Sequence, residues 1–137
     1  MKNLILLTIG ILTTLISNAQ KEAVEKVWFN PEKTSKIQIY KAVDGNLYGR
    51  VIWLKEPNDK NGKPKTDIHN KDEKLRSQPV LGMVIIKKFK KASSANEYED
   101  GTVYDPLSGK TYCGTMSLNG KELKLRGFIC GINFVGR

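Results

Sequence analysis

The chain has 137 residues, with 23 Lys and Arg against 14 Asp and Glu, and a formal net charge of +9. This length predicts one domain, and 39% hydrophobic with 27% charged residues is typical of a folded protein rather than a disordered one. One His and two Cys exclude a His-rich metal site and a four-thiolate zinc site. We therefore expect no metal and no cofactor, and composition alone names neither a reaction nor a ligand.

Residues 1–19 have the pattern of an export signal. Lys2 provides a positive start, residues 4–16 are mostly apolar, and small residues precede a predicted cleavage site before Gln20. The apolar run is shorter than the ~20 residues that a membrane-spanning helix needs, so an uncleaved N-terminal anchor is the less favoured alternative. We expect a periplasmic or secreted protein with one domain at residues 20–137 and no transmembrane span once the signal is removed.

The rest of the chain predicts short strands joined by tight turns. Residues 20–27 suit either a helical turn or a lead into a first strand at Trp28, while Asp44-Gly45-Asn46 and Asn119-Gly120 are typical hairpin turns because Gly and Asn tolerate positive φ. Apolar side chains on both faces of residues 47–54 favour a curved sheet or barrel. The pattern predicts an all-β fold, a small antiparallel barrel or sandwich of about seven to nine strands. The expected strands span residues 36–43, 47–54, 80–89, 101–104, 110–118 and 122–129.

Two polar segments separate these strands. Residues 55–79 form a connection whose length is uncommon unless it is functional, with one helical turn expected near residues 70–76. Residues 92–100 form a second predicted loop. The carboxylates of both loops lie among lysines, so we interpret them as solvated surface rather than an acid–base pair. These carboxylates are Asp67, Asp72, Glu73, Glu97, Glu99 and Asp100.

The order of these segments resembles the bacterial secreted family known as domain of unknown function 2147. The Tyr-Asp-Pro-x-Ser-Gly-Lys-x-Tyr segment at residues 104–112 is the most specific part of the resemblance, although its Asp-Pro and Gly also predict a plain turn. The resemblance implies an exported lipocalin-like (calycin-type) β-barrel without an established activity. The family pattern normally continues into a closing segment, so we expect incomplete closure at the C-terminal side. The matching segments are Trp28, 37–40, 44–54, 67–81, 101–112 and 123–128.

Aromatic residues are distributed over several expected strands, as barrel-lining or ligand-binding residues would be. The resemblance also implies that Trp28 of the first strand packs under Arg126 of a late strand in a cation–π contact. Whether the interior is filled or holds one small ligand stays open, since small barrels do either. The candidate lining or ligand-binding residues are Trp28, Tyr40, Tyr48, Trp53, Tyr104, Tyr112 and Arg126.

Cys113 and Cys130 could form a disulfide in an exported chain. If Leu118 opposes Leu123, however, the two cysteines lie two residues out of line, and a bulge or a bend at the chain end must bring them together. Two free thiols are the alternative.

No catalytic set is visible. His69 lies in a polar loop, no Gly-x-Ser-x-Gly elbow exists, and we assign no catalytic residue. A hydrolase built on Cys113 or Asp105 is the weakest hypothesis, so enzymatic activity stays open and is not favoured.

The positive charge concentrates between residues 55 and 91, with a compact run at Lys87, Lys88, Lys90 and Lys91. Such a patch attracts polyanions, but the aromatic interleaving of a nucleic-acid platform is missing, so no nucleic acid is expected. We favour a non-catalytic binding module for a small, partly apolar molecule. The alternative is an envelope protein that binds anionic glycans or lipids through this basic surface. A hollow or filled interior should distinguish them.

Overall fold

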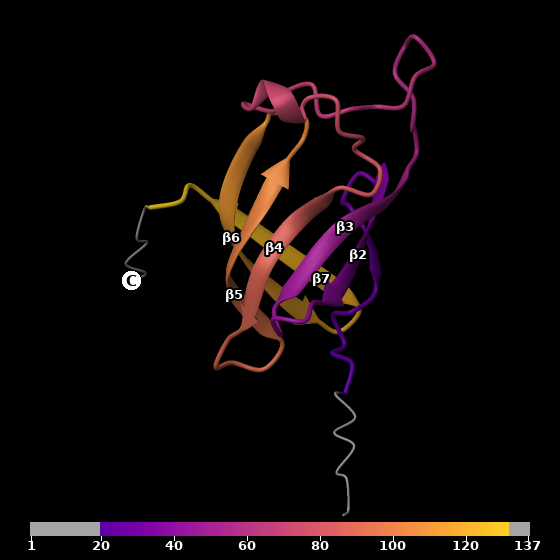
Figure 1. Ribbon diagram of the computed structural model, residues 1–137. Coiled ribbons are helices and arrows are strands. Elements are labelled where there is room, and N and C mark those ends of the chain that lie inside the picture. Colours follow the sequence, from indigo (N-terminus) through magenta and orange to yellow (C-terminus); the bar gives the residue numbers. More distant parts are fainter. Residues whose placement is uncertain (1–19, 132–137) are drawn as a thin grey trace, which may run out of the picture.

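One antiparallel sheet of seven strands curls into a half-barrel in the computed structural model, which describes residues 20–131 (Figure 1). Each strand pairs with its neighbours in sequence, so β1 and β7 remain as the two edges. This confirms the predicted all-β, incompletely closed architecture. The elements are β1 (Val27–Phe29), β2 (Ser35–Lys41), β3 (Leu47–Leu54), a 3₁₀ helix η1 (Glu73–Leu75), β4 (Val84–Lys91), β5 (Glu97–Asp105), β6 (Lys110–Asn119) and β7 (Glu122–Phe128).

The expected export signal at residues 1–19 lies outside the described residues, as do residues 132–137. Within residues 20–131, no helix has the length and apolar character needed to cross a bilayer.

The predicted loop at residues 92–100 is wrong in its second half, because β5 already begins at Glu97. Tyr98 is buried on this strand, while Glu97 and Glu99 are exposed on either side of it. Glu99 lies directly opposite Lys90 of β4, an arrangement that suits opposite charges on the surface of a sheet. The acidic residues of this segment therefore lie on a strand, and Tyr98 between Glu97 and Glu99 belongs to the buried core.

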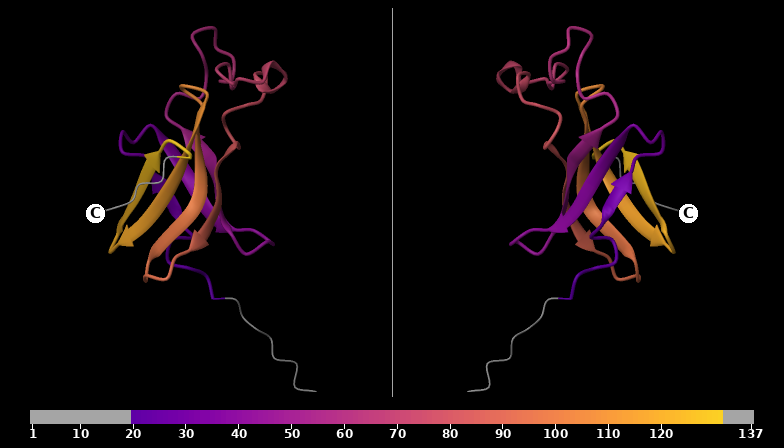
Figure 2. Two further views of the ribbon diagram at one scale, coloured as in Figure 1. Left: turned by 90° about the vertical axis from the view of Figure 1, so that its left-hand side faces the viewer. Right: turned by 90° about the vertical axis from the view of Figure 1, so that its right-hand side faces the viewer.

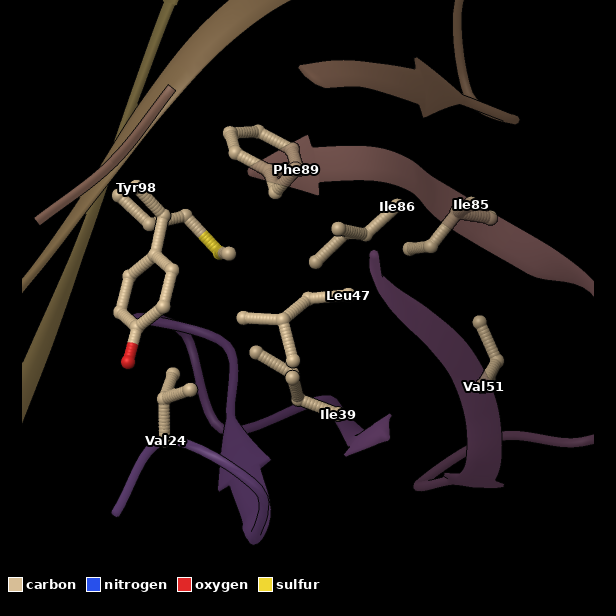
Figure 3. Packing of buried hydrophobic residues seen from close by; sticks show 9 residues of the cluster. Val24, Ile39, Leu47, Val51, Ile85, Ile86, Phe89 and Tyr98 are labelled. Carbon is tan, nitrogen blue, oxygen red and sulfur yellow. The ribbon is translucent and has the colours of Figure 1, made fainter. Parts of the chain in front are cut away.

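Side chains fill the interior of the half-barrel (Figure 3). The ring of Phe89 lies so close to β5 that a Cβ atom on Gly101 would sit 2.1 Å from its Cδ2 atom. A Cβ on Gly49 would likewise sit 2.9 Å from the Cβ of Ile86. At these levels the interior is therefore packed rather than hollow. The buried cluster consists of Val24, Ile39, Leu47, Val51, Ile85, Ile86, Phe89, Tyr98 and Met116.

The segment before β1 closes one end of the half-barrel. Val24 is fully buried, and its carbonyl oxygen accepts a hydrogen bond of 2.9 Å from Nε1 of Trp28. The Tyr98 hydroxyl donates to Oε2 of Glu22 at 2.7 Å, and Lys91 Nζ lies 3.5 Å from the same oxygen. The Tyr98 hydrogen bond is the main cause that lowers the pKa of Glu22. This segment is a plug rather than only a lead into the first strand.

The connection between β3 and β4 rises beyond the opposite end and leans away from β7 (Figure 2). Its two arms pair with each other: Asp67 N donates to the carbonyl oxygen of Gln78 at 2.9 Å, and Thr66 bridges Pro79. This pairing closes residues 66–79 into a compact unit, which we call the cap loop. The expected helical turn near residues 70–76 corresponds to η1 within it.

Candidate binding groove

A groove of about 690 Å³ lies between the cap loop and the neighbouring ends of β4, β5 and β6. Pairing places Lys87 opposite Thr102, and strand alternation puts Tyr104 on the same face as Thr102. Ile86 and Val103 point to the other face, and Ile86 belongs to the buried core. The groove therefore lies on the face of the barrel wall opposite Ile86 and Val103, and Ile85 is the member of the buried cluster that lines it from this face. Its volume falls within the range of roughly 300–1,000 Å³ that is usual for small-molecule sites.

Asp67 attaches the cap loop to β5. Its side chain is only 1% exposed, and the Tyr104 hydroxyl donates to its Oδ1 at 2.7 Å. Asn70 Nδ2 donates to Oδ2 at 2.8 Å, so both carboxylate oxygens have partners. Burial, followed by the hydrogen bond to Asp67, raises the pKa of Tyr104 to about 12. The interpretation of Asp67 as a solvated loop carboxylate is wrong, because the cap loop folds it against the barrel.

The turn after β5 forms a second attachment of the cap loop. Asp105 shapes the turn by accepting from Leu107 N at 3.0 Å and from Ser108 Oγ at 2.7 Å. Gly109 follows at φ +69°, and a Cβ there would lie 1.9 Å from the carbonyl oxygen of His69. Only glycine allows the backbone of the cap loop to approach this closely. The Tyr104–Lys110 segment is thus a turn, as its sequence predicts, and also the seat of the cap loop.

The groove combines apolar and cationic side chains. Leu75 and Leu81 are 36% and 49% exposed, so part of their apolar surface faces solvent. Lys71 lines the groove from the cap loop and Lys87 from β4. Within residues 20–131 neither ammonium group forms a salt bridge. The lining is therefore itself amphipathic.

Of the aromatic candidates, Tyr104 is the one that lines this groove. Tyr40 and Tyr48 stack at 6.1 Å between ring centroids, and the Arg50 guanidinium lies 5.3 Å from the ring centre of Tyr40. The exposed Trp53 ring packs edge-on against Phe29.

The two remaining aromatic candidates serve packing. Trp28 packs against the buried cluster, where it holds the plug segment. Tyr112 lies opposite Val103 in register and contacts the position of Gly127, so it packs against β7. The distribution of aromatic residues along the strands therefore does not mark a shared binding surface.

The implied pairing of Trp28 with Arg126 is wrong. Arg126 is exposed on β7, opposite Thr115, whereas Trp28 packs against the core at β1. Arg126 instead lines a second hollow of about 330 Å³ together with Lys124 and Glu99. Since β7 does not pair with β1 within the described chain, a late-strand arginine is not carried beneath the first-strand tryptophan.

Cys113 and Cys130 form a disulfide, with 5.0 Å between their Cα atoms. The register is the one expected from Leu118 opposite Leu123, and it places Phe128, not Cys130, opposite Cys113. The chain leaves the strand after Phe128 and turns at residues 130–131, which brings Cys130 back to its partner. The bond anchors the end of β7 to β6, and the sulfur of Cys113 is not a free nucleophile.

The four lysines of the basic run do not form one patch. Lys87 lines the groove, Lys90 lies opposite Glu99, and Lys91 pairs with Glu22 at the plugged end. Lys88 has φ 60° and adds to the lowering of the Asp44 pKa, whose largest cause is the hydrogen bond from Tyr48. Binding of anionic glycans or lipids through this run stays a prediction without geometric support.

No group of three or more His, Cys, Asp or Glu side chains in residues 20–131 is arranged to hold a metal ion. His69 is exposed, and its backbone, not its imidazole, forms the contact with the turn at Gly109.

The half-barrel of antiparallel strands paired in sequence order is lipocalin-like, and comparison with known proteins agrees. The chain belongs to the family described as uncharacterized protein conserved in bacteria (DUF2147), whose pattern matches residues 27–137. Among solved structures it is similar to protein HP1028 from Helicobacter pylori, which is described as belonging to the lipocalin family. The sequences are 23% identical, the TM-score is 0.58, and the match covers 74% of this chain and 67% of that chain. No curated protein matches the sequence significantly.

Proposed function

We propose that this protein is an exported, non-catalytic binding module for a small, partly apolar molecule, and that the molecule lies in the groove beneath the cap loop. The observation that carries the proposal is the 690 Å³ groove itself, with partly exposed leucines beside polar groups. Pockets of this kind, mostly apolar with a few placed polar groups, are the usual sites of small ligands.

The packed interior is the result expected for an interaction protein rather than for a carrier with a hollow barrel, so a small ligand of this chain would have to lie outside the centre of the barrel. Phe89 and Ile86 occupy the space that a ligand would need there. The ligand of this chain would therefore contact the groove-lining face of β4–β6 and the inner side of the cap loop. Attachments at Asp67 and Gly109 hold the groove open before the ligand arrives, which reduces the entropy cost of binding.

Export is supported by the N-terminal pattern and by the disulfide, since disulfides persist in oxidising compartments such as the periplasm. In the described part of the chain every cysteine is paired. A periplasmic or secreted location follows as part of the proposal, with residues 20–137 as the working domain.

Fluorescence titration with the neutral apolar probe N-phenyl-1-naphthylamine tests the site. The wild type should bind the probe and enhance its emission. Leu81→Gln should weaken binding by about tenfold, because loss of one apolar contact surface costs roughly 1.5 kcal/mol. Leu81 is already half exposed, so the substitution leaves the core intact.

Leu107→Gln is the matched control. Leu107 is 86% exposed at the tip of the turn and does not line the groove. The affinity of this variant for the probe should therefore equal that of the wild type. Absence of probe binding, or equal losses in the two variants, would overturn the proposal.

A further inference from the structure

The charges of the groove indicate the chemical class of its ligand, an inference that rests on the proposed function. We propose that the ligand is an amphipathic anion, whose acidic group contacts Lys71 and Lys87 while its apolar part covers Leu75 and Leu81.

The first argument is the charge balance within the groove. Its lining contains two ammonium groups and one carboxylate, that of Asp67. This carboxylate is 1% exposed and accepts hydrogen bonds from both Tyr104 and Asn70. No salt bridge joins it to either lysine within residues 20–131, so neither ammonium group is paired with the carboxylate and the lining keeps an excess of positive charge.

The second argument is the placement of the two lysines on different walls. Lys71 belongs to the cap loop, whereas Lys87 belongs to β4 and lies opposite Thr102. An acidic group between the walls would contact both ammonium groups and the threonine hydroxyl. Charge-assisted hydrogen bonds of this type are about twice as strong as neutral ones.

The third argument is the contrast with the other lysines of β4. Lys91 lies 3.5 Å from Glu22 and Lys90 lies opposite Glu99. The hydrogen bond from Tyr48 is the main cause that lowers the pKa of Asp44, and Lys88 is close enough to add to it, so each of the three lysines has an acidic neighbour. Lys87 instead has Thr102 as its cross-strand neighbour and faces the groove. Lys87 is thus the lysine of this strand for which these contacts give no acidic neighbour, and it is the one that lines the groove.

Two probes with the same ring system, which differ only in a sulfonate group, separate the effect of charge from that of apolar contact. 1-Anilinonaphthalene-8-sulfonate carries a sulfonate, and N-phenyl-1-naphthylamine does not. The wild type should bind the sulfonate probe about tenfold more tightly, and added salt should reduce this preference because screening weakens charge interactions. Displacement by dodecanoate, dodecyl phosphate and dodecanol then identifies the acidic group, and the neutral alcohol should be the weakest competitor.

The double variant Lys71→Gln/Lys87→Gln should lose the preference and keep its affinity for the neutral probe. Lys90→Gln, which removes the same charge from the same strand outside the groove, should behave as the wild type. Circular dichroism confirms that each variant is folded.

Equal binding of the two probes by the wild type, or equal losses in the double variant and in Lys90→Gln, would overturn this inference alone. Failure of both probes to bind would instead overturn the proposed function.

Discussion

The hydroxyl of Tyr104 donates a hydrogen bond of 2.7 Å to Oδ1 of Asp67, joining β5 to a residue 37 positions earlier in the chain. This contact ties the most specific segment of the family resemblance to the cap loop. It therefore connects the turn chemistry of residues 104–110 with the shape of the groove.

Tyr104→Phe should lower the free energy of unfolding by about 1.5–3 kcal/mol, because a buried carboxylate loses one of its two donors. Urea unfolding followed by tryptophan fluorescence measures the change. Tyr48→Phe is the control: its hydroxyl bonds the exposed Asp44, so a change within roughly 0.5 kcal/mol is expected. Equal effects of the two substitutions would show that Asp67 does not hold the cap loop.

Alkaline pH should weaken the same contact. The pKa of Tyr104 is raised from 10.0 to about 12, so the folded state favours the protonated phenol. The stability that it contributes is complete below pH 10 and is lost as the pH rises through 12. The difference in unfolding free energy between wild type and Tyr104→Phe should therefore shrink over this range. A difference that stays constant from pH 9 to pH 12 would contradict the assignment.

Gly109→Ala should destabilise the protein more than Gly45→Ala. Both glycines have positive φ, which costs a non-glycine residue about 1–2 kcal/mol. A Cβ at Gly45 meets open space, whereas one at Gly109 collides with the backbone of His69. Because Gly109→Ala displaces the cap loop, it should lower the free energy of unfolding by roughly 1 kcal/mol or more beyond the loss in Gly45→Ala, and it should weaken probe binding in the groove. Matching losses in the two variants would mean that the turn does not seat the loop.

Gly101→Ala tests whether the interior is filled. The added methyl group meets the Phe89 ring, so a loss of about 1–3 kcal/mol is expected. Phe89→Leu creates space at the same place. The double variant should therefore lose less unfolding free energy than the two single variants together, by about 0.5 kcal/mol or more. Strictly additive losses, measured by urea unfolding, would indicate an interior with spare room.

Much of the fold follows from local patterns. The hairpins at Gly45 and Gly120 form where turn chemistry predicts them, and the residues of β3 match the expected strand at 47–54. Register between β6 and β7 also follows from the Asn119-Gly120 turn, because a tight turn determines which residues lie opposite.

Bulges explain why the faces of some strands could not be predicted. Pairing shifts between Lys36 and Ile37, so that Lys36 lies opposite Trp53 while Ile37 lies opposite Val51. Trp53 therefore joins the exposed Phe29 instead of the interior. Lys88 and Asp100, at φ 60° and 59°, change the phase of alternation in β4 and β5. An irregularity of one residue reverses the face on which every following residue of the strand lies, and no local sequence pattern marks the position of the irregularity.

The composition and local patterns of 137 residues determined a small all-β domain, because strand period and turn chemistry depend only on near neighbours. Tertiary structure decided where a ligand could bind. The cap loop buries Asp67 through contacts with Tyr104 and with the turn at Gly109, all distant in sequence. Phe89 fills the barrel because Gly101 of β5, which faces its ring, has no side chain. The groove forms, and the two lysines come to face it, only once these long-range contacts are made.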